Sequence, residues 1–313
     1  MGLRHDQWSV TEADAGRVDR FIKHASGRSW NDIRGLFHWR CVTINDAVVT
    51  QLEQPLVAGD RVQLRHDPAQ KYHAPPEQRT HASLRIVHED AHILVVDKPA
   101  PLLSIATDRG DQHTLESMVT RHLRHRDPRA AAGIVHRLDR EVSGLLVVAT
   151  SRATARDLQQ QFRAHKPLRE YTAIVAGKVR DERGTIASRL GTTRSLQRYS
   201  VGDEEEGQDA TTHYEVRQRL FGATLLKVTL ETGRRNQIRV HLSEAGHPVL
   251  GDERYSPDEA KHRHWKLRRL ALHANRLGFA HPVSGEPLEF ESAPPPEFGH
   301  FIHNSTLRPP SGR

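Results

Sequence analysis

One stretch of the sequence gathers charged side chains in a pattern that could do chemistry. Residues 134–150 read IVHRLDREVSGLLVVAT, and the apolar end of this stretch is typical of a strand buried on both faces. Five side chains directly precede that strand: His136, Arg137, Asp139, Arg140 and Glu141. A polar loop at a sheet edge is a common place for catalysis, because the scaffold holds the loop rigid. By a small margin, these residues alone favour an Arg–Asp turn that only caps the strand.

Several other patterns that carry chemistry are absent. The sequence contains no G-x-S-x-G, no G-x-x-x-x-G-K-[ST] and no G-x-G-x-x-G that opens a helix. His262 and His264 form an H-x-H pair, but without cysteine or carboxylate support we do not expect it to bind metal. Cys41 is the single cysteine, which excludes a disulfide framework and a cysteine-based zinc site. We therefore expect neither a metal nor a cofactor.

The composition favours an anionic partner. Lys plus Arg is 46 and Asp plus Glu is 39, which gives a formal net charge of +7. This balance favours nucleic acid over a membrane surface. No stretch approaches the roughly 18 apolar residues that cross a bilayer, and Met1–Val10 is too polar for a secretory signal. We therefore expect a soluble, cytoplasmic monomer that does not bind membranes.

Basic residues are concentrated in two stretches. Arg121–Arg140 contains six arginines and two aspartates, and Lys261–Arg276 contains six basic residues and no acid. A solvated helix face is the commoner meaning of such a run. The lack of counter-charge in the second stretch shifts the interpretation toward a surface that binds phosphates.

Periodicity predicts the elements that position these residues. The expected strands are Leu84–Val87, His92–Asp97, Gly144–Ala149, Tyr171–Val179 and Ala223–Glu231, and the expected helices are Thr114–His125, Ser151–Ala164 and Gln237–Ala245. Asn236 is expected to be the N-cap of the last helix, which ends at Gly246.

The N-terminal part predicts a separate small module. Gly16–Gly27 and Ser29–Arg40 are expected to be helices, with Ser29 as an N-cap, and short strands follow. Pro68–His81 interrupts any periodicity and predicts a linker. The expected division is a module at 1–67, a linker at 68–82, a catalytic domain at 83–299 and a tail at 300–313.

The stretch that begins at His136 resembles the signature of the RluA-type RNA pseudouridine synthases. Four further segments resemble that family in the same order along the chain: Ile86–Pro99, Arg169–Gly177, Thr232–Asp252 and Leu270–Pro282. Residues 16–67 resemble the alpha-L RNA-binding module that is also found in a small-subunit ribosomal protein. The resemblance implies an α+β fold with a mixed, mainly antiparallel sheet, flanking helices and a central cleft.

The resemblance also implies an activity and three catalytic residues. The enzyme would be an isomerase, an intramolecular transferase that breaks the N1–C1′ bond of a uridine, turns the base and joins C5 to C1′ without a cofactor. Asp139 would be the catalytic carboxylate, which can stabilise charge on the sugar or bond to C1′. Arg239 would keep that carboxylate charged, and Tyr171 would stack on the uracil and help move a proton.

Asn236 departs from the resemblance, because the family usually has histidine there. As an N-cap, it should leave the helix start intact, and we expect the catalytic residues not to depend on it. Two rival readings remain open. One is an inactive RNA-binding or ribosome assembly factor. The other is a glycosidase, disfavoured because Glu141 would point away from Asp139.

The substrate is expected to be a structured RNA, either ribosomal or transfer RNA. The uridine must be flipped out of its stack at a cost of a few kcal/mol, which contacts to phosphates would offset. The expected RNA-binding residues of the catalytic domain are Arg137, Arg140, Lys261, Arg263, Lys266, Arg268 and Arg269. In the nearly neutral N-terminal module, Arg28, Arg34 and Arg40 would recognise RNA shape.

Overall fold

The chain forms two compact units, each with its own core. The computed structural model describes residues 4–68, 70, 72, 84–107, 111–194, 196–202 and 205–306. The N-terminal unit holds the described residues up to Tyr72 and short segments at 107 and 192–197, and the larger unit holds the rest. Among the described helices, none is long and apolar enough to cross a membrane.

The N-terminal unit packs two helices against small sheets. Its helices are α1 (Val18–Ser26) and α2 (Trp30–His38), with a 3-10 turn η1 at Glu12–Asp14. One sheet has the order β1 (Arg4–Ser9), β6 (Arg61–His66), β3 (Val42–Ile44) and β4 (Ala47–Val48), and β2 (Gly16–Arg17) pairs with β5 (Pro55–Leu56). Both predicted helices are confirmed, and Ser29 caps α2 by accepting a hydrogen bond from the Asp32 amide. Tyr72, from the expected linker, is buried in this core, whereas 73–83 lie outside the described residues.

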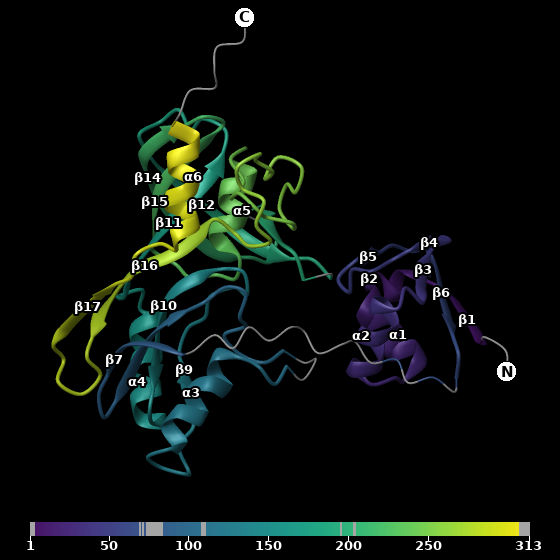
Figure 1. Ribbon diagram of the computed structural model, residues 1–313, viewed down its shortest axis with the longest axis horizontal. Coiled ribbons are helices and arrows are strands. Elements are labelled where there is room, and N and C mark those ends of the chain that lie inside the picture. Colours follow the sequence, from purple (N-terminus) through teal and green to yellow (C-terminus); the bar gives the residue numbers. More distant parts are fainter. Residues whose placement is uncertain are drawn as a thin grey trace, which may run out of the picture. The chain divides into compact units, whose positions relative to one another are not determined.

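An eleven-stranded sheet forms the centre of the larger unit (Figure 1). Its main path runs β13 (Arg198–Val201), β12 (Arg183–Thr192), β14 (Gln208–Leu220), β15 (Ala223–Leu230), β11 (Leu168–Ala176), β16 (Leu272–Ala280), β10 (Ser143–Ala149), β8 (Ile93–Lys98) and β7 (Arg85–Glu89). β9 (Gly133–Ile134) pairs with β10, and β17 (Pro287–Glu291) pairs with β16. The pair β10–β16 is parallel, whereas β8–β10 and β11–β16 are antiparallel. The predicted α+β class with a mixed sheet is confirmed.

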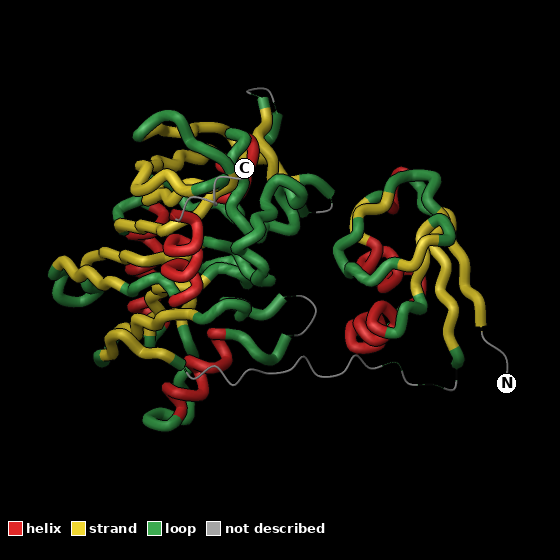
Figure 2. The backbone as a smooth tube through the Cα atoms, turned by 45° about the horizontal axis from the view of Figure 1, so that its top comes forward, coloured by secondary structure: helices red, strands yellow, loops and turns green. Residues whose placement is uncertain are grey.

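Helices cover both faces of this sheet, which explains why β10 is buried throughout. Leu145 and Leu146 are neighbours in β10, but they belong to different cores because successive side chains of a strand point to opposite faces. The helices α3 (Leu115–Arg124), α5 (Gln237–Glu244) and α6 (Pro296–Thr306) contribute to the core that contains Leu146, and α4 (Arg152–Arg163) contributes to the other. The connection from α5 to β16 contains no further helix or strand (Figure 2).

Two element ends differ from the sequence prediction. α6 continues to Thr306, where a tail was expected from residue 300, because Phe298 and Phe301 on one helix face are buried against Trp265. Residues 307–313 lie outside the described residues. Asn236 precedes α5 as expected, but it has a φ of 57° and its side chain forms no cap hydrogen bond.

Candidate active site

A rigid loop between β9 and β10 carries Asp139. The Ser104 hydroxyl donates to the Leu138 carbonyl (2.8 Å) and accepts from the Leu138 amide (3.1 Å). Gly144 follows with a φ of 120°, and a Cβ there would lie 2.3 Å from the Ala274 carbonyl oxygen. Glycine is therefore required where β10 passes the neighbouring strand β16, and this close contact fixes the end of the loop.

Two basic residues, Lys98 and His136, support the same loop. Lys98 is buried, and its Nζ donates to the carbonyl oxygens of Leu102 (2.7 Å) and Arg140 (3.3 Å). Burial lowers the pKa of Lys98 to about 7, although the charge of Asp139 opposes this shift. The His136 ring stacks on Phe162 with centroids 4.4 Å apart, and burial lowers its pKa to about 3. His136 is therefore neutral, and its role is structural.

Arg239 connects Asp139 to a second, fully buried carboxylate. Its Nη1 donates to Asp139 Oδ2 (3.1 Å), and its Nε and Nη2 donate to the two oxygens of Asp252 at 2.7 and 2.8 Å. Burial opposes the charge on Arg239, but hydrogen bonds and charges from Asp252 and Asp139 raise its pKa. The guanidinium is thus permanently charged, and this paired geometry orients it toward Asp139.

Tyr171 lies on β11 near this ion pair. The strand has an irregular register between Glu170 and Tyr171, and the Tyr171 side chain is largely buried. Burial raises the pKa of Tyr171 to about 12, with a further contribution from the charge of Asp139. The phenol is therefore protonated at neutral pH and can donate a hydrogen bond. The structure thus brings together Asp139, Arg239 and Tyr171, which lie far apart in the sequence.

Three residues of this site were missed as functional: Asn236, Asp252 and Tyr255. The Asn236 amide nitrogen donates to Asp139 Oδ2 at 2.6 Å. The expectation that Asn236 caps α5 and leaves the catalytic residues independent of it is wrong, because its left-handed backbone turns the side chain toward Asp139. The Tyr255 ring lies 5.1 Å from the Arg239 guanidinium. Asp252 is identified as part of the site by its burial against Arg239. Burial of an aspartate cannot be read from its residue type, so the sequence did not reveal it.

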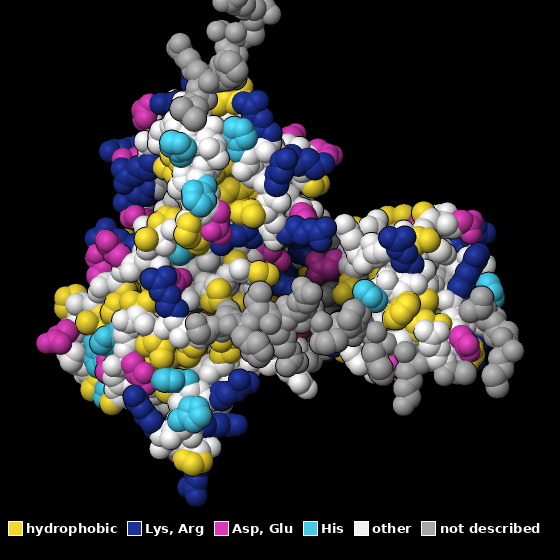
Figure 3. Space-filling view, in the orientation of Figure 1, with side chains coloured by type: hydrophobic (Ala, Val, Ile, Leu, Met, Phe, Trp, Pro, Cys, Tyr) yellow, Lys and Arg dark blue, Asp and Glu magenta, His cyan; other side chains and the backbone are white. Residues whose placement is uncertain are grey.

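Additional arginines lie close to these residues. Arg137 and Arg140 are exposed beside Asp139. Burial lowers the pKa of Arg235, and the charges of Arg198, Arg254 and Arg137 lower it further. Like charges brought together in this way favour binding of an anion. On the face in Figure 3, Lys and Arg side chains are spread among acidic ones, and several gather at the end of α3.

The stretch Lys261–Arg276 was expected to lack counter-charge. This expectation is wrong, because acidic side chains outside the stretch pair with it in the folded chain. Lys261 pairs with Asp258 at 2.7 Å, and Arg269 pairs with Glu297 at 2.7 Å. Arg269 is largely buried and also donates to the Ser143 hydroxyl, so its position suits structural support rather than contact with RNA. The acids come from other segments, which a scan along the sequence cannot see. Arg263 stacks on Phe221, and Lys266 and Arg268 are exposed.

Of the three arginines expected to recognise RNA in the N-terminal unit, one lies in α2 and the other two follow α1 and α2. Arg28 follows α1, and its Nη2 lies 2.9 Å from Nε2 of His66. Arg34 is partly buried within α2, and Arg40, which lies just after α2, is exposed.

Residues 88–92 match the H-E-x-x-H pattern. The match lies in the β7–β8 hairpin rather than on a helix, so its two histidines cannot act as an i, i+4 pair of ligands. Glu89 pairs with His122 and Arg126, and His88 contacts Asp90. Within the described part of the chain, no group of three or more His, Cys, Asp or Glu side chains could hold a metal ion.

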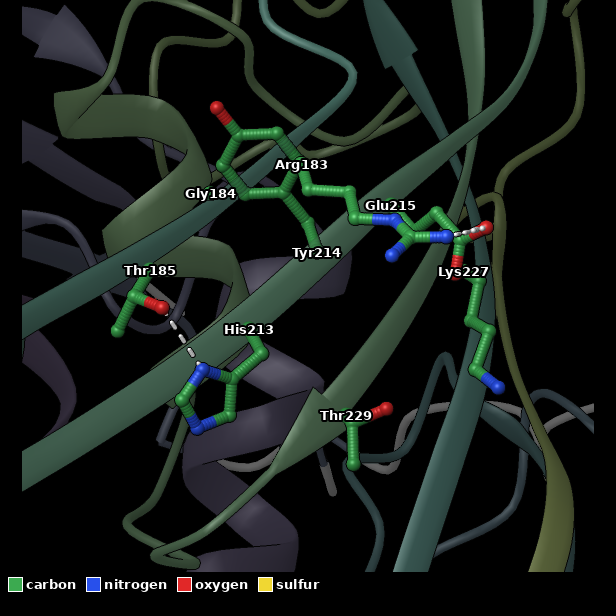
Figure 4. Close-up of a pocket in the computed structure, with 8 residues that line it drawn as sticks. All are labelled: Arg183, Gly184, Thr185, His213, Tyr214, Glu215, Lys227 and Thr229. Atoms are coloured by element: carbon green, nitrogen blue, oxygen red, sulfur yellow. Dashed lines mark hydrogen bonds and ion pairs between the residues drawn. The ribbon is translucent and has the colours of Figure 1, made fainter.

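A hollow of about 410 Å³ lies on the sheet, formed by β12, β14 and β15 (Figure 4). Four of its polar side chains form two pairs: Arg183 pairs with Glu215 (3.4 Å), and Thr185 contacts His213 (2.8 Å). None of the predicted catalytic residues lines it. We therefore assign the candidate active site to the ion pair between Asp139 and Arg239.

Known proteins are similar to this chain in sequence and in fold. The family model for RNA pseudouridylate synthase matches residues 92–244. The ribosomal large subunit pseudouridine synthase D of Nitrosomonas europaea is 34% identical, with 88% of this chain and 82% of that protein aligned. An uncharacterized RNA pseudouridine synthase of Aquifex aeolicus is 32% identical over 92% of this chain and 93% of that protein. The structure of human RNA pseudouridylate synthase domain containing 4 is similar in fold, with a TM-score of 0.61 and 24% identity over 72% of this chain and 95% of that one. The chain therefore belongs to the RNA pseudouridine synthase family and is an isomerase.

Proposed function

We propose that the protein converts a uridine of large-subunit ribosomal RNA to pseudouridine, with Asp139 as the catalytic carboxylate. The observation that carries this proposal is the Asp139–Arg239 ion pair, in which a partly exposed carboxylate is held by a largely buried guanidinium. The name of the Nitrosomonas europaea relative supports ribosomal RNA as the first substrate to test.

The proposed reaction needs one carboxylate and no external reactant. Breaking the N1–C1′ bond leaves positive charge on the sugar, which Asp139 stabilises or captures by bonding to C1′. The base then turns and C5 bonds to C1′, and where Asp139 has bonded to C1′ that bond breaks and frees the carboxylate. The proton lost from C5 is balanced by the one gained at N1, so the product is an isomer.

Arg239 and Tyr171 have supporting roles in this proposal. Arg239 holds Asp139 in place through the hydrogen bond from Nη1 to Oδ2, and Asp252 fixes the position of the guanidinium. Tyr171 lies against the flipped uracil and donates a hydrogen bond from its phenol. Its pKa of about 12 makes it a poor base in the resting enzyme.

The arginines around the site would hold the RNA while the uridine is flipped out. Arg137, Arg140 and Arg235 are the strongest candidates, because they lie on or beside the elements that carry Asp139 and Arg239. In the N-terminal unit, Arg28, Arg34 and Arg40 would recognise RNA shape. Lys266 and Arg268 remain candidates for peripheral phosphate contacts.

Tritium release from RNA labelled at uracil C5 tests the proposed function. The purified protein should release tritium from large-subunit ribosomal RNA, and sequencing of the product should place pseudouridine at a defined position. Small-subunit ribosomal RNA and transfer RNA are the matched controls. Release from transfer RNA alone would correct the substrate. Binding without release from any of these RNAs would favour the alternative, an inactive RNA-binding or ribosome assembly factor.

A further inference from the structure

Asn236 has an unusual backbone conformation beside the proposed catalytic carboxylate. With a φ of 57°, it lies in the left-handed region, which most residues other than glycine, asparagine, aspartate and histidine avoid. Its side chain leaves the amides of α5 without the expected cap and is directed at Asp139 instead. A capping hydrogen bond has thus been exchanged for a contact with the active site.

The contact is part of a short chain of hydrogen bonds. The Asn236 amide nitrogen donates to Asp139 Oδ2 (2.6 Å), and its oxygen lies 3.4 Å from the Tyr255 hydroxyl. A carboxylate only accepts hydrogen bonds, so the NH₂ group of the amide must face Asp139. The Tyr255 hydroxyl accepts from the Arg198 amide (3.1 Å), which fixes its place behind Asn236.

Both side-chain donors to Asp139 bind the same carboxylate oxygen. Asn236 and Arg239 Nη1 each donate to Oδ2, at 2.6 and 3.1 Å. No side chain in the described part of the chain donates to Oδ1. One oxygen is therefore held by the protein, and the other is left to the reacting sugar.

We propose that Asn236 is a positioning residue that, with Arg239, holds Oδ2 of Asp139 so that Oδ1 faces C1′ of the uridine. This inference rests on the proposed role of Asp139. Asparagine suits the position because it tolerates the left-handed backbone and supplies a neutral donor. Aspartate would tolerate the backbone but would place a second negative charge against Asp139.

Substitutions that separate the backbone from the side chain test this inference. N236G keeps a backbone free to adopt positive φ but removes the donor, so it should fold like the wild type. Its single-turnover rate on bound RNA should fall about 10- to 100-fold, the range expected for a lost hydrogen bond to a charged group, with little change in RNA Kd. H165G is the matched control, since His165 also has a positive φ (55°) and is exposed on the loop after α4.

Two further variants exclude a purely structural role. N236H restores an N–H donor on a residue that tolerates this backbone, and it should recover at least part of the rate lost in N236G. N236D matches asparagine in shape but carries the opposing charge, and it should be slower than N236G. If N236D and N236H equal N236G, or if N236G keeps a rate within about twofold of the wild type, the inference is overturned.

D139N, measured in parallel, separates the two proposals. An inactive D139N together with a fully active N236G would remove the positioning role and leave the proposed function intact. A fully active D139N would remove the catalytic role of Asp139 and the positioning role of Asn236 with it, whereas a wild-type protein that releases no tritium from any RNA would remove the proposed function.

Discussion

The D252N substitution should lower both the stability of the larger unit and the rate of the reaction at the candidate active site. Asp252 has no exposed side-chain surface and accepts two hydrogen bonds from Arg239. Asparagine retains an oxygen for the amides of Arg254 and Tyr255, which bind Asp252 Oδ1 at 2.9 and 3.0 Å. It removes the negative charge and directs an NH₂ group at a guanidinium, which has no acceptor.

The size of this effect follows from the buried ion pair. Removing one partner of such a pair costs about 3–5 kcal/mol. Because Arg239 keeps Asp139 as a second anion, we expect the lower end, about 3 kcal/mol. In a domain of about 150–250 residues, this corresponds to a fall in Tm of roughly 6–12 °C. The single-turnover rate should also fall, because Arg239 loses the partner that orients it toward Asp139.

Differential scanning calorimetry and single-turnover tritium release are the appropriate assays. D258N is the matched control, because Asp258 is exposed and pairs only with Lys261 at the surface, and we expect no measurable change. A D252N protein that melts within about 2 °C of the wild type and keeps its rate would refute the reasoning, because Asp252 would then not hold Arg239 in place.

Three other perturbations have defined outcomes. G144A should cost more than about 2 kcal/mol in urea denaturation, because its Cβ would meet the Ala274 backbone at 2.3 Å; a cost below 1 kcal/mol contradicts this close approach. The pKa of Lys98 falls to about 7 on folding, so the unfolded chain binds more protons than the folded chain between about pH 7 and 10. The free energy of unfolding of the wild type, relative to that of K98M, should therefore rise with pH in this window. A difference that does not change with pH contradicts the shift. R235Q should reduce the slope of log Kd for RNA against log salt concentration by about 0.7–0.9, and an unchanged slope would exclude a phosphate contact.

Regular elements could be predicted from the sequence because their signals are local. The run Gly144–Ala149 is apolar at every position, and it forms the central strand β10, buried on both faces. Ser29 precedes α2 and caps it as expected, and Ser151, the first residue of another predicted helix, caps α4. Strands such as β12 and β14 were not predicted, because their largely polar residues give no clean alternation of apolar and polar positions.

The candidate site was predicted in its main residues but not in its connections. Asp139 and Arg239 come from motifs 100 residues apart, and only the folded chain brings them to 3.1 Å. The function of Asn236 depends on a left-handed backbone that its residue type permits but does not require. Arg269 was misjudged for the same reason, since its partner Glu297 lies 28 residues away on α6.

The central claim is that Asp139 is the catalytic carboxylate of an RNA pseudouridine synthase. Its most direct test is single-turnover tritium release from C5-labelled large-subunit ribosomal RNA by wild type and D139N, with RNA binding measured for both. We predict that D139N binds the RNA as tightly as the wild type and releases no tritium. Equal release by the two proteins would contradict the claim.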